Sequence, residues 1–579
     1  MEKLSGAQMV IRALEDEGVD HIFGYPGGAV IDIYDALYNS HKIKHILVRH
    51  EQSAAHAADG YARATGRVGV CLVTSGPGAT NTVTGIATAY MDSVPIVVIT
   101  GQVATKYIGQ DAFQEVDTIG ITRPIVKHSF LCKSALDIPV AIKKAFYIAS
   151  TGRPGPVVID IPKDCQSPKN LFDYEYPKSV SMRSYNPTLV GHKGQVKRAA
   201  KVLAGAQHPV MLIGGGTIIS NASAEVKEVA ERFNMPVTST LMGLGAFPAT
   251  DSRFLGMLGM HGTYEANMTM HNSDVILAVG TRFADRITNN VAKFCPNAKI
   301  IHIDVDPTSI AKTVRADIPI VGSCEIVLRQ LLEAADELGV QKDSSAHADW
   351  WSMIDGWRGR HCLAFKKDPE NIKPQEVIEE LWNVTGGKCI VCSDVGQHQM
   401  FIAQHFKFDR PRQWLNSGGL GTMGYGFPAA IGAQIALPGE KVCVISGDGS
   451  FQMNSQELST CLQYHLPLKI IIMDNKALGN VKQWQDMFYG GRHSETILND
   501  NPDFVKLAEA YGHVGMRILL PSELHDGLAE AFSDKYKDRL VLIDVRIDPE
   551  EKVFPMQLGG GAMCDIRFSE TETTETARK

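Results

Sequence analysis

The sequence lacks the features of a membrane protein or a nucleic-acid-binding protein. Its apolar runs, such as VPIVVIT and LKIIIM, fall far short of the roughly 20 residues that a membrane-spanning helix needs. It has no basic stripe, and its formal net charge is −7, which disfavours a nucleic acid or an anionic membrane as partner. The N-terminus, MEKLSGAQMVIRALEDEG, indicates an amphipathic helix without a signal or transit pattern. We therefore expect a cytoplasmic protein.

Paired cysteines are also missing. The 11 cysteines are an odd number and are scattered along the chain, so no disulfide framework is indicated. Cys389 and Cys392 have the CxxC spacing of a redox or zinc site, but no second CxxC completes a tetrahedral ligand set. We interpret both as strand residues.

Continuous Val/Ile runs alternate with helical stretches, which predicts parallel sheets buried on both faces. The length of 579 residues allows three or four domains. We predict an α/β protein with three doubly wound parallel-sheet domains, at residues 1–165, 189–340 and 374–550, joined by linkers at 166–188 and 341–373 and followed by a tail at 551–579. The polar end of that tail, SETETTETARK, is expected to be disordered.

Fourteen segments are predicted to contain strands. They are residues 21–28, 45–51, 68–78, 95–101, 155–164, 208–216, 235–243, 274–283, 298–307, 388–394, 412–419, 441–449, 467–475 and 539–545. Ligands of such folds bind at the carboxyl ends of the strands, so the chemistry is sought there.

Two of these strands end in an acidic or amide side chain. KVCVIS runs into Gly447, Asp448 and Gly449, and LKIIIM runs into Asp474 and Asn475. The glycines let the backbone approach a ligand, and the helix that follows offers its N-terminus to an anion. A carboxylate would repel a bare phosphate, but Mg²⁺ held by Asp448 and Asn475 would join the two. Each motif alone is more often a simple turn or a cap; the pair is more specific.

The spacing of the GDG motif and the asparagine resembles the fingerprint of thiamine diphosphate enzymes. That resemblance requires a carboxyl group that hydrogen-bonds the cofactor's pyrimidine N1′. Glu51, in RHEQSAAHAADGYARATG, occupies the matching position. A dipole-favoured residue at a helix start is the simpler interpretation of Glu51 alone. The family supplies Glu51 and Asp448 from different subunits, which implies a homodimer.

Further segments resemble the bacterial-type catalytic large subunit of the acetohydroxyacid synthase (acetolactate synthase) family. They include FGYPGGAVIDIYDAL, LVTSGPGATN, DAFQE, RPGPVVIDIPKD, SDVGQHQM, GGLGTMGYGFPAAIG and VKQWQ, and the match runs from Leu4 to about Met556. The resemblance implies decarboxylation of pyruvate on thiamine diphosphate and ligation of the hydroxyethyl group to pyruvate or 2-ketobutyrate, in branched-chain amino acid biosynthesis. It also implies a small regulatory subunit.

The resemblance assigns site residues one at a time. Those implied for catalysis are Glu51, Gly28, Gln114 and Lys163, with Gly27 beside Gly28 in the active-site turn. Those implied for thiamine diphosphate are Glu51, Gln397, His398, Gly421, Met423, Gly447, Asp448, Gly449 and Ser450. The Mg²⁺ ligands would be Asp448, Asn475 and the carbonyl of Ala477, and the substrate pocket Phe113, Gln114, Lys163, Asn480 and Trp484.

The middle domain resembles the family's FAD site. The matching positions are Arg153, Gly214, Gly215, Gly216, Thr240, Leu241, Met260, His261, Gly280, Arg282, Asp285, Arg286 and Asp304. The glycine triplet alone is only a turn, because IGGG is not GxGxxG. Two positions depart from the family: Ala284 replaces the first Asp of FDDR, and Asn480 replaces the Met of GMVKQW.

Two alternatives remain at this stage. A pyruvate oxidase or decarboxylase on the same fold would share the GDG motif and the glutamate, whereas Lys163, DAFQE and VKQWQ favour the synthase. A regulatory module with degenerate nucleotide-binding domains is the non-enzyme alternative, and the intact Glu51, Asp448 and Asn475 argue against it.

Overall fold

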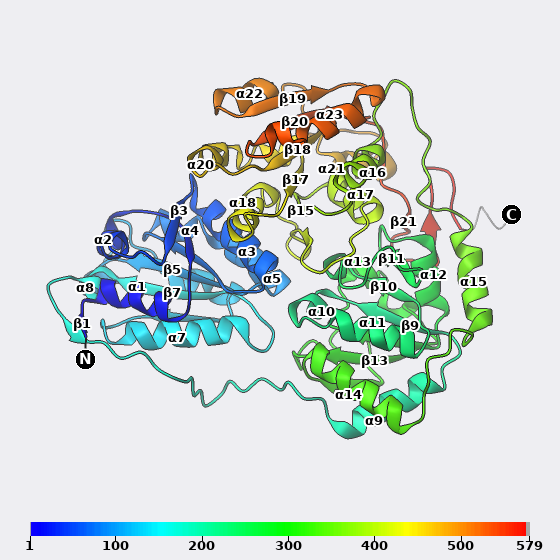
Figure 1. The fold of residues 1–579 in the computed structure, drawn as a ribbon, viewed down its shortest axis with the longest axis horizontal. Helices are drawn as coiled ribbons and strands as arrows, with labels where there is room; N and C mark the ends of the chain where they lie inside the picture. The colour runs from blue at the N-terminus through cyan, green and yellow to red at the C-terminus, as the bar shows by residue number, and fades with distance from the viewer. Residues whose placement is uncertain (1, 575–579) are drawn as a thin grey trace.

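The computed structural model describes residues 2–574, which form three six-stranded sheets with helices on both faces (Figure 1). Every strand pair in these three sheets is parallel. The predicted class, three doubly wound α/β units, is therefore confirmed. No helix within the described residues is long and apolar enough to cross a bilayer.

The first sheet has the strand order β3-β2-β4-β5-β7-β6. These strands span Lys44–Leu47, His21–Tyr25, Gly69–Val73, Ile96–Gln102, Val157–Pro162 and His128–Leu131. Its helices are α1 (Gly6–Asp16), α2 (Ile31–Tyr38), α3 (Glu51–Thr65), α4 (Pro77–Thr80), α5 (Val83–Asp92), α6 (Thr118–Thr122), α7 (Asp137–Ser150) and α8 (Lys163–Gln166). Every residue of β4 and β5 is buried, because helices cover both faces of the sheet.

The second sheet has the order β11-β10-β9-β12-β13-β14. These strands span Phe254–Met257, Val237–Ser239, Pro209–Ile213, Val275–Val279, Lys299–Asp304 and Ile318–Val321. Its helices are α9 (Lys193–Ala204), α10 (Gly215–Ile219), α11 (Ser223–Arg232), α12 (Tyr264–Asn272), α13 (Asp285–Thr288) and α14 (Cys324–Glu337).

The third sheet has the order β16-β15-β17-β18-β20-β19. These strands span Trp414–Leu415, Ile390–Ser393, Val442–Gly447, Lys469–Asp474, Val541–Arg546 and Val514–Ile518. Its helices are α16 (Pro374–Thr385), α17 (Gln397–His405), α18 (Gly426–Ala436), α19 (Asp448–Phe451), α20 (Leu458–Gln463), α21 (Gly479–Phe488), α22 (Phe504–Ala510) and α23 (Leu524–Ala531).

Each sheet reverses its winding direction next to its first strand, between β2 and β4, between β9 and β12, and between β15 and β17. A doubly wound sheet leaves a crevice at this switch point, beyond the carboxyl ends of the strands. The loops that follow these six strands are therefore where the fold itself places ligands.

The first and third sheets are joined through helices α3 and α18, which cross at close range (Figure 1). A Cβ on Gly432 would lie 1.8 Å from the carbonyl oxygen of Ala57, and one on Gly60 would lie 2.0 Å from that of Ala429. The two glycines therefore allow backbone contact that any larger residue would prevent. This contact fixes the first sheet against the third within one chain.

A buried charge cluster lies beside this crossing. The Arg63 guanidinium bonds Asp59 at 2.6 Å and Asp92 at 3.0 Å, and the Tyr425 hydroxyl donates to Asp59 at 2.7 Å. The pKa of Arg63 is raised well above its ordinary value, because Asp59, Tyr425 and Asp92 outweigh burial, which lowers it. The pairing therefore keeps charges satisfied where water is excluded.

The connecting segments are more structured than their composition suggests. Residues 341–373 contain the helix α15 (Ala348–Arg358), whose Trp350 is 1% exposed in the core of the middle unit. Strand β1 (Lys3–Leu4) pairs with β8 (Phe172–Asp173) in the first connection. Strand β21 (Met556–Gln557) pairs with β22 (Ile566–Arg567) near the C-terminus.

The prediction of disorder for the C-terminal residues is wrong for 569–574. Thr574 is buried, its backbone N–H donates to the carbonyl of Ile566, and Glu572 pairs with Arg360. The polar side chains are therefore satisfied by partners that the sequence alone does not place nearby. Residues 575–579 of the predicted tail lie outside the described residues.

Candidate active site at the carboxyl edges of the three sheets

The carboxyl edge of the third sheet brings the predicted cation ligands together. Strands β17 and β18 are parallel neighbours, with Gly447 opposite Met473, so Asp448 and Asn475 follow adjacent strand ends. The Oδ1 atom of Asn475 accepts the backbone N–H of Ala477 at 3.1 Å, which closes a turn and orients that segment. Asp448, Asn475 and Ala477 thus lie on two neighbouring loops.

Asp448 is nearly fully buried and has a specific neutral partner. Its Oδ2 atom accepts the Asn501 amide at 2.6 Å, and the same amide lies 3.4 Å from Asp474 Oδ1. Burial raises the pKa of Asp448 to about 7, the Asn501 hydrogen bond opposes this, and the charge of Asp474 adds to the rise. A cation would stabilise the carboxylate that burial and Asp474 destabilise.

The donor types at this edge suit Mg²⁺. Within residues 2–574 no three His, Cys, Asp or Glu side chains gather as a metal-binding set. A cation here would be held by the Asp448 carboxylate with an amide and a carbonyl oxygen, and the ligand that bridges it would supply further oxygens. Cys389 and Cys392 are both buried; Cys392 lies in β15 as predicted, whereas Cys389 directly precedes that strand.

The loops after β15 and β17 form the switch-point crevice of this sheet. They carry Gln397, His398, Gly447, Gly449 and Ser450. The His398 Nε2 atom is buried without a hydrogen-bond partner, and burial lowers the pKa of His398 to about 4, so the ring is neutral. A Cβ on Gly447 would lie 3.1 Å from that ring. An unpartnered ring nitrogen beside a glycine turn is consistent with a ligand at this crevice.

The loop that carries Gly421 and Met423 is held by two buried carboxylates. Asp394 accepts the Gly424 N–H at 2.8 Å, and Asp92 accepts the N–H groups of Gly418 and Gly419 at 3.1 and 2.7 Å. Gly421 is exposed and has φ +72°, while Met423 is half-buried. The loop is therefore fixed at both ends while its tip stays accessible.

The first sheet places its candidates at its own carboxyl edge. Gly27 and Gly28 follow β2. Lys163 follows β7 and is exposed. Glu51 begins α3, and its Oε2 accepts the Asn81 amide at 2.9 Å. This partner polarises and orients the carboxyl group.

Phe113 and Gln114 lie on a loop beside the turn that follows β4. The backbone of Gln114 packs against Gly76, where a Cβ would lie 2.8 Å from the Gln114 carbonyl oxygen. Gln114 has φ +60°, and Phe113 is 88% exposed. An aromatic side chain exposed to this degree has no packing role within its own chain.

The structure does not join the two halves of this site within one chain. Within residues 2–574, no hydrogen bond or ion pair links Glu51, Phe113, Gln114 or Lys163 to the carboxyl edge of the third sheet. The described residues instead connect α3 to the C-terminal unit through Ser53, which donates to Asn454 at 3.0 Å.

Asn480 and Trp484 lie on the single helix α21, one turn apart and therefore on the same face of the helix. Trp484 is 41% exposed, and its ring centroid lies 5.1 Å from that of Phe488. Trp484 is therefore not a buried core aromatic.

The middle sheet places the predicted flavin residues along its carboxyl edge, on both sides of its switch point. Gly214–Gly216 follow β9 and Gly280 follows β12, and a Cβ on Gly214 would lie 2.2 Å from the Gly280 carbonyl oxygen. Thr240 and Leu241 follow β10, Met260 and His261 follow β11, and Asp304 ends β13. Burial raises the pKa of Asp304 to about 6. The glycines let the turns after β9 and β12 touch through their backbones, and the loops at this carboxyl edge form the cradle of the middle sheet.

Four charged candidates border that cradle. Arg153 comes from the first unit and pairs with Asp306 at 3.3 Å; Arg282 donates to the Met91 carbonyl at 3.1 Å. Asp285 and Arg286 are exposed on α13, and Ala284 caps that helix without a side-chain hydrogen bond. Arg153 and Arg282 thus link the middle unit to the first.

Sequence reasoning missed several polar partners. Asn81, Asp92, Asp394, Gln483 and Asn501 all hold candidate site residues or their loops. Asn81, Asp394 and Gln483 lie inside the motifs LVTSGPGATN, SDVGQHQM and VKQWQ, and this position was their only signal in the sequence. A cavity of about 510 Å³ lies elsewhere, at the amino end of the first sheet, where Lys143 pairs with Glu17 and Arg67 with Asp20.

Comparisons with known proteins agree with this geometry. The family described as "Thiamine pyrophosphate enzyme, N-terminal TPP binding domain" matches residues 4–121, the central domain of the same enzymes matches 196–331, and their C-terminal TPP binding domain matches 394–545. The fold and the site therefore define a thiamine pyrophosphate enzyme.

Relatives narrow this class. The chain is 60% identical to the "Acetolactate synthase isozyme 3 large subunit" of Escherichia coli (strain K12), over 99% of this chain and 100% of the relative. It is 58% identical to the "Acetolactate synthase large subunit" of Haemophilus influenzae, over 99% of both chains. It is 51% identical to a "Probable acetolactate synthase large subunit" of Methanocaldococcus jannaschii, over 97% of this chain and 95% of the relative. The chain belongs to the acetolactate synthase large-subunit family.

Proposed function

We propose that this chain is the catalytic subunit of an acetolactate synthase that takes pyruvate as donor. One C–C bond of the donor breaks with release of CO₂, and a new C–C bond joins its carbonyl carbon to that of a second 2-ketoacid. Pyruvate as acceptor gives 2-acetolactate, and 2-ketobutyrate gives 2-aceto-2-hydroxybutyrate. The main observation is that Asp448 and Asn475 end neighbouring strands in a chain that matches these synthases over its full length.

Thiamine diphosphate would supply the ring that stabilises the negative charge left by loss of CO₂. Asp448, Asn475 and the Ala477 carbonyl would hold Mg²⁺ against the diphosphate, while Gln397 and His398 would bind the diphosphate oxygens. Gly447, Gly449 and Ser450 would line the approach. Support comes from the unpartnered His398 Nε2 and from the buried Asp448 carboxyl.

Glu51 would hold a proton at the pyrimidine N1′ of the cofactor. Asn81 donates to its Oε2 and so fixes the carboxyl rotamer. Met423, from a loop anchored by Asp394, would support the cofactor from below, with Gly421 at the same loop tip.

A second copy of the chain would complete the site. Glu51 and the Asp448 edge each lie at a sheet's carboxyl end, yet no described contact joins them within one chain. In a homodimer, Glu51, Gly28, Gln114, Lys163 and Phe113 of one subunit would face the Asp448 edge of its partner. The 88% exposure of Phe113 supports such a covered position.

Asn480 and Trp484 would border the acceptor. Trp484 combines a large apolar face with 41% exposure, which suits contact with the extra methyl group of 2-ketobutyrate. The cradle of the middle sheet would bind FAD, which the proposed ligation does not reduce or oxidise because it has no net electron transfer. A small regulatory subunit would accompany the catalytic chain, as the large-subunit names of the relatives suggest.

The test is an assay of the purified chain with Mg²⁺, thiamine diphosphate and FAD. Pyruvate should yield one CO₂ per 2-acetolactate, and mass should correspond to a dimer under assay conditions. A product of acetaldehyde or acetate in place of 2-acetolactate would contradict the proposed ligation.

A further inference from the structure

Helix α21 packs against the rest of the protein through two buried polar residues. Lys482 is 6% exposed and Gln483 is 3% exposed, whereas Trp484 on the same helix is 41% exposed. The helix therefore turns a polar face inward and its aromatic residue outward. Buried polar side chains such as these need a hydrogen-bond or ion-pair partner for each polar group.

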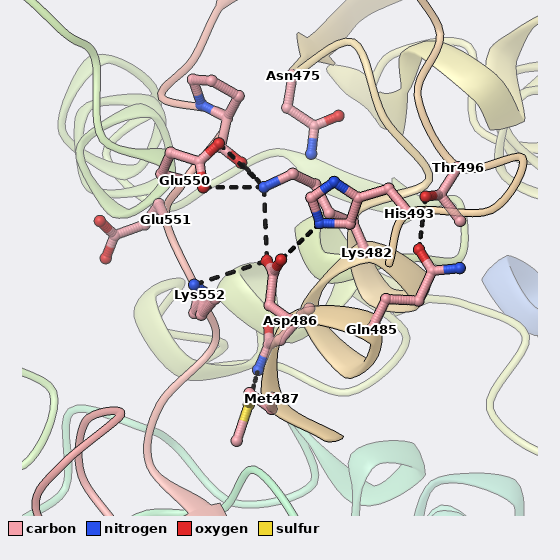
Figure 2. Close-up of polar contacts among 12 residues, drawn as sticks. Asn475, Lys482, Gln485, Asp486, Met487, His493, Thr496, Glu550, Glu551 and Lys552 are labelled. Atoms are coloured by element: carbon pink, nitrogen blue, oxygen red, sulfur yellow. Dashed lines mark hydrogen bonds and ion pairs between the residues drawn. The ribbon is translucent and has the colours of Figure 1, made fainter. Parts of the chain in front are cut away.

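The segment 549–553, which follows β20, supplies those partners. The Lys482 Nζ atom donates to Glu550 at 2.9 and 3.0 Å and lies 3.4 Å from the Pro549 carbonyl oxygen. It also pairs with Asp486 on the next helical turn at 3.5 Å. Figure 2 shows the ammonium group between these carboxylates.

Asp486 ties a third segment into the same cluster. His493 contacts its Oδ1 at 2.5 Å, and Lys552 lies 3.6 Å from its Oδ2 (Figure 2). Burial raises the pKa of Asp486, but the His493 hydrogen bond and the charges of Lys482 and Lys552 lower it below its ordinary value. Asp486 therefore stays a carboxylate, and the cluster joins α21, the loop after it and the segment 549–553.

Gln483 has a different set of contacts. It accepts the Val553 N–H at 2.9 Å and the Gln397 amide at 2.8 Å. Gln397 is a proposed diphosphate contact, so Gln483 couples the helix to the cofactor. Among residues 2–574, Lys482 has no such link, and its partners lie only in the segment 549–553 and within α21.

We infer that Lys482 is a positioning residue that fixes the orientation of α21 and thereby places Trp484 against the acceptor. The inference rests on the proposed function, which gives Trp484 that role. A roll of the helix would remove the ammonium group from Glu550 and leave a buried charge unpaired, which is strongly unfavourable. One orientation of Trp484 is thus selected by a contact on the opposite face of its helix.

The test compares Lys482→Met with wild type in the cofactor-loaded enzyme. Equal concentrations of pyruvate and 2-ketobutyrate should give a product ratio shifted at least about threefold toward 2-acetolactate, as a well-packed methyl group is worth roughly 10–200-fold. The KM for 2-ketobutyrate should rise more than kcat falls, and thiamine diphosphate affinity should stay within about twofold because Gln483 is intact. Lys482→Arg should restore the wild-type ratio.

Two further variants separate positioning from loss of stability. Glu550→Gln removes the charge of an exposed partner, leaves Asp486 as the carboxylate that pairs with Lys482, and should shift the ratio in the same direction. Lys469→Met removes a buried lysine at the opposite end of β18, whose Nζ donates to two carbonyls, and should lower the melting temperature without moving the ratio. An equal ratio shift in Lys469→Met would overturn the inference.

A double variant distinguishes this inference from the proposed function. In a Trp484→Leu background, Lys482→Met should leave the product ratio unchanged, because Lys482 acts through Trp484. A further shift of the same size in that background would overturn the inference. If Trp484→Leu alone leaves the ratio unchanged, the pocket assignment fails; if it shifts the ratio but Lys482→Met does not, only the inference fails.

Discussion

Asn501 donates its side-chain amide to the Asp448 carboxylate at 2.6 Å, across 53 positions of sequence. The Gln452 side-chain amide donates in turn to the side-chain Oδ1 of Asn501 at 3.1 Å and to the Asp448 backbone carbonyl at 3.0 Å. These contacts fix one carboxylate oxygen of the proposed cation ligand. They also keep Asp448 at a defined distance from Asp474.

Replacing Asn501 with alanine should weaken Mg²⁺ and thiamine diphosphate binding together. A hydrogen bond to a charged group contributes about 1.5–3 kcal/mol, which corresponds to roughly 10–150-fold in affinity. Calorimetric titration of Mg²⁺ with the cofactor present measures this directly. Asn499→Ala, at an exposed position of the same loop, is the control and should leave the affinity unchanged. Asp448→Ala should lower the Mg²⁺ affinity more than Asn501→Ala does. Equal Mg²⁺ affinities of the two variants would contradict the assignment of Asp448 as a ligand.

Glu51→Gln should lower kcat by about 10²–10⁴-fold, because an amide cannot hold the exchangeable proton at N1′. Cofactor affinity and melting temperature should change little, since glutamine keeps the shape of the side chain. Asn81→Ala should lower kcat by a smaller factor, because it removes only the hydrogen bond that orients Glu51. Activity of Glu51→Gln within a few-fold of wild type would exclude the role.

Exchange of FAD for its 5-deaza analogue should preserve 2-acetolactate formation, because the ligation transfers no electrons to the flavin. The analogue should be shown to fill the site by its absorbance in the purified protein. Gly216→Val should prevent binding of either flavin, since a Cβ there would lie 2.7 Å from the Gly280 Cα. Loss of ligation with the analogue fully bound would point instead to an oxidase-like reaction.

Trp484→Leu should lose most of the preference for 2-ketobutyrate while still making 2-acetolactate from pyruvate. The expected loss is about 10-fold or more, the value of one well-packed methylene group. Trp382→Leu on α16 is a matched control for the loss of an indole and should leave the ratio unchanged. An unchanged ratio in stably folded Trp484→Leu would contradict the assignment of Trp484 to the pocket.

Asn480→Met should alter the ratio of the two products with little change in melting temperature.

Asp92→Ala should destabilise the fold by about 3–5 kcal/mol, because it leaves a buried Arg63 with one carboxylate and frees two backbone N–H groups. Chemical denaturation with thiamine diphosphate absent measures the effect apart from ligand binding. Glu530→Ala, which breaks an exposed pair with Lys535, is the control and should leave stability nearly unchanged. A loss for Asp92→Ala no larger than that of this control would show that the cluster is not structural.

The central strands of all three sheets were predictable from sequence. Strands such as β5 and β18 are continuous apolar runs because helices cover both of their faces. The strands β6, β11, β14 and β19 were not predicted, and each lies at the edge of its sheet. Edge strands are partly exposed and short, so their residues mix apolar and polar types without a distinct run.

The sequence by itself determined the class of fold and the chemistry of the candidate ligands. Asp448 and Asn475 stand directly after strands, so local pattern and the rule for parallel sheets were enough to bring them together. The tertiary structure alone decided which partners hold them. Asn501 reaches Asp448 across 53 positions, and Glu550 reaches Lys482 across 68. Such contacts depend on how loops return over a sheet edge, and no residue periodicity encodes that path.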